Sequence, residues 1–218
     1  TLLVAAAAAG DGSAAVTVRG ANADDMPAVL AVLRSAGHSL SIAHDTITIK
    51  ARRRGKPIRL TARPFPGLPT DLQPLLLALA ATGDGESRIR DAVFPHRWMH
   101  VAELARLGAR IRLEGNTAIV HGVSLQGARV AATDLRAAAA LVVAGLAAEG
   151  ETIVESLTHL DRGYERLDAK LASLGADVGR SRHGVLPAIY PSSPRNNGCP
   201  STLRPEVIGP RSASSRSI

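Results

Sequence analysis

The sequence predicts an α/β protein in which a unit of about 70 residues occurs three times. Three similar helix endings, spaced 71 and 67 residues apart, carry the glycines Gly37, Gly108 and Gly175. A second landmark is a glycine that follows an Ala/Leu-rich segment. It occurs three times, at Gly12, Gly85 and Gly150, with spacings of 73 and 65 residues. Two independent landmarks with one period indicate internal repetition, and so an approximate threefold symmetry.

Within one period the order is helix, strand, helix, strand, strand. The first complete helix is expected at 25–36, where Pro27 suits the first turn and Met26, Val29, Leu30 and Leu33 share one face. Hairpins are expected at 39–50 and 109–121, each after a helix-ending glycine. One-sided helices and strands predict a layered or barrel α/β arrangement of stacked repeats, not a Rossmann order.

Composition and charge exclude several classes of protein. The apolar run at 2–9 is too short to span a membrane and lacks the flanks of a signal peptide. The single cysteine, Cys199, excludes a disulfide framework and favours a reducing, cytoplasmic compartment. Of the formal charge of +7, a net +4 lies after residue 180, and the chain has only five aromatic residues, which argues against nucleic-acid binding.

The last part of the chain differs in composition from the rest. From residue 181 onward it contains six of the thirteen prolines, eight serines and no lasting apolar periodicity. We therefore expect a domain over 1–183 and a disordered, unrelated tail over 184–218. The start at Thr1, without a methionine, predicts that the sequence is a fragment of something longer.

Two helix starts share a Thr-Asp pattern, at Thr70-Asp71 and at Thr133-Asp134. The simpler interpretation is that these residues cap helices by accepting bonds from exposed backbone N–H groups. The functional alternative is an anion site at a helix start, with Arg136 in the first turn supplying a planar cation.

Three further segments allow a structural and a functional interpretation. His96, His100 and Glu103 are spaced for one helix face and favour a surface or domain-facing helix start over a metal site. The basic run 52–56 favours a solvated loop over a phosphate contact. In 159–165, Arg162 stands beside Gly163, whose small size would let a substrate approach the backbone.

Four segments together resemble a known family. Residues 91–101 (DAVFPHRWMHV), 66–73 (PGLPTDLQ), 132–137 (ATDLRA) and 159–165 (HLDRGYE) are similar, in order and spacing, to motifs of bacterial UDP-N-acetylglucosamine enolpyruvyl transferases. The resemblance covers roughly 1–180 and corresponds to the C-terminal part of such an enzyme only.

The resemblance implies a fold and an activity. The fold would be an inside-out α/β barrel of βαβαββ repeats with pseudo-threefold symmetry, truncated in this chain. The family transfers the enolpyruvyl group of phosphoenolpyruvate to the 3′-hydroxyl of UDP-N-acetylglucosamine and releases phosphate, as the committed step of peptidoglycan synthesis. The resemblance implies no metal and no organic cofactor.

Site roles follow from the same resemblance. Asp71 matches the carboxylate that contacts the sugar nucleotide and acts as the base for its hydroxyl, and Val93 matches a sugar-nucleotide contact. Arginines that surround phosphoenolpyruvate are matched by Arg97, Arg136 and Arg162. Asp134 matches the acid beside them and Leu135 a backbone contact, so Asp71, Asp134 and Arg162 are the expected catalytic residues.

The sequence differs from the family in ways that affect whether its active site is complete. Its other domain, which carries a lysine and a mobile acid/base loop, has no counterpart here, and Cys199 matches nothing. We therefore expect an incomplete active site that needs the missing N-terminal half. The alternatives are a shikimate-using relative, which shares the fold but not the segment at 94–101, and a non-catalytic remnant of the fold.

Overall fold

The computed structural model describes residues 1–180, so the expected boundary at residue 183 and the tail lie outside the described residues. The first repeat comprises α1 (Leu2–Ala9), β1 (Ala15–Arg19), η1 (Ala23–Asp25), α2 (Pro27–Ser35), β2 (Ser39–Ala43) and β3 (Thr46–Lys50). The expected helix at 25–36 therefore begins at Pro27, whose missing N–H is no loss at a helix start, and a separate 3-10 turn precedes it.

The second repeat shows the full order βαβαββ. It comprises β4 (Arg59–Ala62), η2 (Thr70–Leu72), α3 (Gln73–Thr82), β5 (Glu86–Asp91), α4 (His100–Arg106), β6 (Arg110–Glu114) and β7 (Thr117–His121). The third comprises β8 (Arg129–Ala131), α5 (Leu135–Ala147), β9 (Ile153–Glu155), α6 (Thr158–Gly163) and α7 (Leu167–Ser173).

The described strands form three separate sheets, one in each repeat, with the orders β1-β3-β2, β4-β5-β7-β6 and β8-β9. In the first two, the central hairpin strand pairs antiparallel with β1 or β5. In the second and third, the first two strands run parallel. The same connectivity recurs and the strands of residues 1–180 form no doubly wound sheet, which confirms the repeat interpretation.

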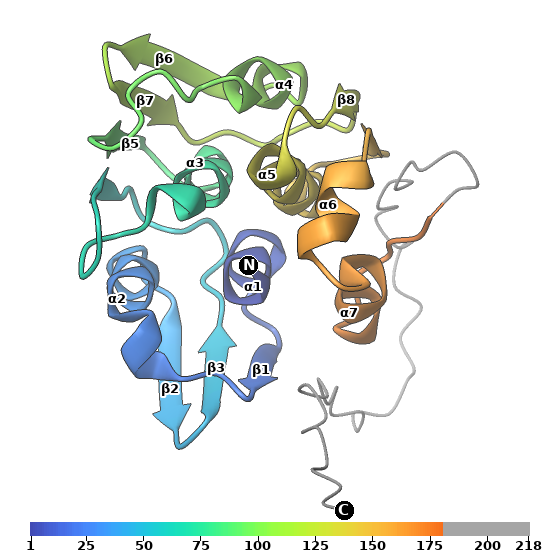
Figure 1. Ribbon diagram of the computed structural model, residues 1–218. Helices are drawn as coiled ribbons and strands as arrows, with labels where there is room; N and C mark the ends of the chain where they lie inside the picture. Colours follow the sequence, from blue (N-terminus) through green and yellow to red (C-terminus); the bar gives the residue numbers. More distant parts are fainter. Residues whose placement is uncertain (181–218) are drawn as a thin grey trace, which may run out of the picture.

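The helices α1, α3 and α5 lie at the centre and the sheets lie around them (Figure 1). All residues of α3 from Gln73 to Ala81 are buried, and so are those of α5 from Ala137 to Gly145. The expectation of one apolar stripe is therefore wrong for these two helices, because a helix surrounded by protein is apolar on every side. It holds for α2, which buries Val29, Leu30 and Leu33.

The landmark glycines have the backbone conformation that their pattern predicts. Gly37, Gly108 and Gly175 follow their helices with φ of 87°, 85° and 90°. That left-handed conformation is strained for residues with a side chain. None of the helices within residues 1–180 is long and apolar enough to cross a membrane.

Candidate functional site

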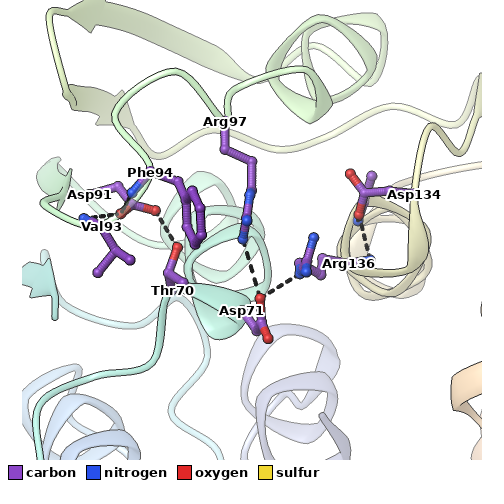
Figure 2. Close-up of polar contacts among 9 residues, drawn as sticks. Thr70, Asp71, Asp91, Val93, Phe94, Arg97, Asp134 and Arg136 are labelled. Atoms are coloured by element: carbon purple, nitrogen blue, oxygen red, sulfur yellow. Dashed lines mark hydrogen bonds and ion pairs between the residues drawn. The ribbon is translucent and has the colours of Figure 1, made fainter. Parts of the chain in front are cut away.

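Asp71 lies at the start of the central helix α3 and joins two arginines from other parts of the chain (Figure 2). Its Oδ1 accepts a hydrogen bond from Nη1 of Arg97 at 3.2 Å and lies 2.5 Å from Nε of Arg136. No residue within 1–180 donates a hydrogen bond to Oδ2, and 63% of the side chain is exposed. One carboxylate oxygen is thus held while the other faces solvent.

The guanidinium of Arg97 is fixed from a second side. Its central carbon lies 3.7 Å from the centre of the Phe94 ring, a cation–π contact within the loop between β5 and α4. The loop is anchored further by Trp98, whose indole N–H donates to the carbonyl of Pro95 at 2.8 Å. Arg97 therefore presents a pre-oriented cation at the mouth of the site.

Asp91, at the end of β5, organises this loop and is fully buried. Its Oδ1 accepts from the backbone N–H groups of Val93 and Phe94, both at 2.8 Å. Its Oδ2 accepts from the hydroxyl of Thr70 at 2.5 Å, which ties the turn carrying Asp71 to the same point (Figure 2). Asp91 has no predicted role of its own, although an aspartate followed by a tight turn is a signal for such side-chain to backbone bonds.

The two Thr-Asp patterns serve different purposes. Asp134 caps α5, since its Oδ1 accepts from the backbone N–H groups of Arg136 at 2.7 Å and Ala137 at 3.1 Å. Asp71 makes no such capping bond at its 3-10 turn. The capping interpretation is confirmed for Asp134 and wrong for Asp71. Both helix starts lie at the same end of the molecule. Arg136, in the first turn of α5, contacts Asp71, in the 3-10 turn that precedes α3.

Arg162 belongs to α6 and is exposed, with no hydrogen bond or ion pair to another residue of 1–180. Its neighbour Gly163 does not open the backbone to a ligand, because a Cβ there would lie 2.8 Å from Cδ2 of Leu135. The glycine lets α6 pack on the start of α5. Gly163, the neighbour of Arg162, thus packs on Leu135, but within residues 1–180 no hydrogen bond or ion pair joins Arg162 to Asp71 or its two arginines.

The histidine segment does not form a metal site within the described residues. His100 is buried and lies 3.5 Å from the amide nitrogen of Gln73, and Glu103 accepts from the backbone N–H of Ala131. Burial lowers the pKa of His100 to about 4. The expectation of a surface or domain-facing helix start holds at His96, which is exposed, whereas His100 packs inward beside Trp98.

The basic run at 52–56 is largely a structural loop. Arg54 donates from Nε to Asp84 at 2.7 Å and from Nη2 to the carbonyl of Gly83 at 2.9 Å. These bonds tie the connection after β3 to the end of α3. Within residues 1–180 no hydrogen bond or ion pair joins this loop to Asp71, so the loop is solvated and also anchors the chain.

The cluster of Asp71, Arg97 and Arg136 can hold an anion beside a free carboxylate oxygen. Arg136 uses only Nε within the described residues, which leaves both terminal amino groups for a two-point contact with phosphate or carboxylate. The free Oδ2 of Asp71 can accept a proton or hydroxyl nearby. The cluster carries one more positive than negative charge, which suits a reaction of phosphorylated anions.

The fold is that of the enolpyruvyl transferases. Residues 1–171 match the family model of EPSP synthase (3-phosphoshikimate 1-carboxyvinyltransferase), and the chain belongs to this family. The enolpyruvyl transferase NikO from Streptomyces tendae superposes with a TM-score of 0.72 at 29% identity, over 87% of this chain and 44% of that one. EPSP synthase from Acinetobacter baumannii, at 18% identity and a TM-score of 0.64, shares the fold.

Curated relatives narrow the likeness within the family. The UDP-N-acetylglucosamine 1-carboxyvinyltransferase of Azorhizobium caulinodans is 51% identical over 167 residues, which are 76% of this chain and 39% of that protein. The enzyme of the same name from Chelativorans sp. (strain BNC1) is 49% identical over 180 residues, 82% of this chain and 41% of its own length. This chain thus spans about two fifths of the relatives that it matches.

Proposed function

We propose that this chain provides one half of the active site of a UDP-N-acetylglucosamine enolpyruvyl transferase. The observation that carries the proposal is the exposed carboxylate of Asp71 held between Arg97 and Arg136. The names of the relatives support UDP-N-acetylglucosamine as the acceptor. The reaction uses phosphoenolpyruvate as donor, needs no cofactor, and takes place in the cytoplasm as a step of cell-wall synthesis.

The roles follow from the geometry of the cluster. Oδ2 of Asp71, which is free of bonds within 1–180, takes the proton of the attacking 3′-hydroxyl. The hydroxyl oxygen bonds to C2 of phosphoenolpyruvate while an acid outside this sequence protonates C3, which gives a tetrahedral adduct. The bond from C2 to the phosphate oxygen then breaks, C3 loses a proton to restore the double bond, and phosphate leaves. Arg97 and Arg136 stabilise the carboxylate and phosphate charges of the donor while these bonds change.

The remaining assignments belong to the same proposal. Arg162 reaches the donor from α6. Val93 and Leu135 contact the substrates through the loop after β5 and the start of α5. Asp134 acts indirectly, because its carboxylate holds the first turn of α5 and so orients Arg136. The site is completed by protein outside this sequence, the N-terminal half of the relatives' architecture.

A chimera tests the proposal with the chain's own residues in place. The matched 167 residues of the Azorhizobium caulinodans relative are replaced by the aligned segment of this chain. Phosphate release from phosphoenolpyruvate is then measured with UDP-N-acetylglucosamine and with shikimate 3-phosphate. We expect turnover with the sugar nucleotide alone, and a fall in kcat of about 100-fold or more for Asp71→Asn, the usual contribution of a general base.

Asp84→Asn is the matched control, since Asp84 is also an aspartate paired with an arginine, Arg54 at 2.7 Å, and its side chain is about half exposed. It should leave kcat within about twofold, as surface ion pairs contribute little. A folded chimera that turns over shikimate 3-phosphate instead would establish the shikimate-using alternative. A folded chimera with no turnover, or full activity of Asp71→Asn, would contradict the catalytic role and favour a non-catalytic remnant.

A further inference from the structure

The outward face of the second sheet carries a group of arginines that the proposed active site does not use. A shallow groove of about 310 Å³ lies on this face. Its lining comes from β4, β5 and β7 and comprises Arg59, Leu60, Thr61, Arg88, Arg90 and Thr117, called here the arginine groove. The sheet lies at the periphery of the molecule, with the central helices behind it (Figure 1).

Strand register brings the cations together. Arg59 on β4 pairs with Arg88 on β5, and Thr61 pairs with Arg90. Neighbouring strands are about 4.8 Å apart, so Arg59 and Arg88 start from adjacent points of the sheet. Like charges directly opposite each other destabilise a sheet unless an anion lies between them.

The acids of the described chain offset only part of this charge. Arg88 pairs with Glu86 at 2.9 Å. Arg59 and Arg90 form no hydrogen bond or ion pair with another side chain of residues 1–180. Both arginines are exposed, so their guanidinium groups are available to a ligand from solvent.

The arginine side chains lie over a buried apolar residue of the sheet. Ile119 on β7 is fully buried although it lies on the arginine-bearing side of the sheet. Its register partners are Arg88 on one side and Arg112 on the other, and their aliphatic stems are placed to cover it. Stems packed in this way restrict the arginines and reduce the entropy lost when an anion binds.

We propose that the arginine groove binds a phosphate dianion, either free phosphate or the phosphate of a small monoester. Arg59 and Arg90 supply planar two-point donors, and the hydroxyl of Thr61 supplies a further donor between them. The groove is separate from the cluster around Asp71. Arg90 and Asp91 are consecutive in β5, so one faces the groove while the other faces the interior.

Arginine side-chain resonances test this site independently of activity. The 1H–15N signals of the Arg59 and Arg90 Nε–H groups are followed during titration of the protein with sodium phosphate, glycerol 3-phosphate or sodium chloride at equal ionic strength. We expect saturable shifts with at least one phosphate compound and none with chloride. Which of the two compounds binds more tightly identifies free phosphate or a monoester as the ligand.

Variants show whether the residues act together. Arg59→Gln should weaken the phosphate-induced shift of Arg90 by about tenfold in Kd, as expected for loss of one charge-assisted contact. Arg106→Gln removes the same charge from an exposed arginine of α4 outside the groove and should leave the Kd unchanged. Equal shifts with chloride and phosphate, or an unchanged Arg90 shift in Arg59→Gln, would overturn the proposal. Since no turnover is measured, failure of the enzymatic proposal would leave this result standing.

Discussion

Replacement of Asp91 tests whether one buried carboxylate supports both sides of the candidate site. In Asp91→Ala the backbone N–H groups of Val93 and Phe94 and the hydroxyl of Thr70 lose their acceptor together. Each lost hydrogen bond costs about 1 to 1.5 kcal/mol, so the free energy of unfolding should fall by about 3 to 5 kcal/mol. In a chain of this size that corresponds to a fall in Tm of roughly 10 °C.

The assay is urea and thermal unfolding of the purified chain, followed by circular dichroism. Asp91→Asn keeps the shape of the side chain but removes its charge and one acceptor oxygen. The amide oxygen still accepts from both backbone groups, while the NH2 group must donate to Thr70. We expect a loss of about 1 to 2 kcal/mol for this variant. The control Asp84→Ala removes a partly exposed ion pair and should cost no more than about 1 kcal/mol.

The same variants connect the carboxylate to the site. In the chimera, Asp91→Asn should raise KM for the sugar nucleotide more than it lowers kcat, because it loosens the turn that bears Asp71 without removing a reacting group. A loss below about 1 kcal/mol in Asp91→Ala would refute the reasoning, since three hydrogen bonds to a buried carboxylate cannot be removed at so little cost. Unchanged kinetics in a destabilised Asp91→Asn chimera would confine the residue to a role in stability.

Three other substitutions should give distinct results. Arg162→Ala should leave Tm within about 2 °C, since no described residue bonds to Arg162. In the chimera it should lower kcat/KM for phosphoenolpyruvate by the equivalent of about 2 to 4 kcal/mol. Full turnover by this variant would exclude Arg162 from the site. Gly122→Ala should prevent stable folding or cost more than about 3 kcal/mol in urea unfolding, because its Cβ would lie 2.0 Å from the carbonyl oxygen of Gly83, and a neutral effect would contradict the close approach. The pKa of His100 is lowered from 6.5 to about 4 by burial, so the unfolded chain binds the proton more readily and stability should decline as pH falls from about 6.5 to 4, by about 3 kcal/mol. His100→Gln should show a shallower decline over that window, and identical pH profiles would contradict the buried neutral histidine.

The repeat could be predicted from sequence because its signals are local. A left-handed residue after a helix demands glycine whatever surrounds it, so Gly37, Gly108 and Gly175 mark equivalent points without knowledge of the fold. Burial on every side of α3 and α5 could not be predicted in the same way. Alanine and leucine runs give no stripe, and only the three-dimensional arrangement shows that each helix is surrounded by the others.

The sequence predicted which residues belong to the candidate site better than it predicted the role of each residue. Thr70-Asp71 and Thr133-Asp134 are the same pattern, and both suit a cap. What distinguishes them is the approach of Arg97 and Arg136 to Asp71 from segments far away in sequence, which depends on how the repeats pack. The resemblance to family motifs predicted Arg97 and Arg136 as site residues. The supporting role of Asp91 was not predicted, because its partners are mostly backbone groups.

The central position of α1, α3 and α5 has a consequence for how the protein tolerates mutation. All three sheets pack around the same helices, and much of that surface is alanine, as in Ala137 to Ala140 of α5. Added methyl groups there have no free space to fill, so one enlarged side chain displaces elements of more than one repeat. In a saturation screen, tolerance should therefore increase outward from helix to strand. The permissive positions are the solvent-facing sides of the sheets, where new surface chemistry can be acquired without disturbing the interior.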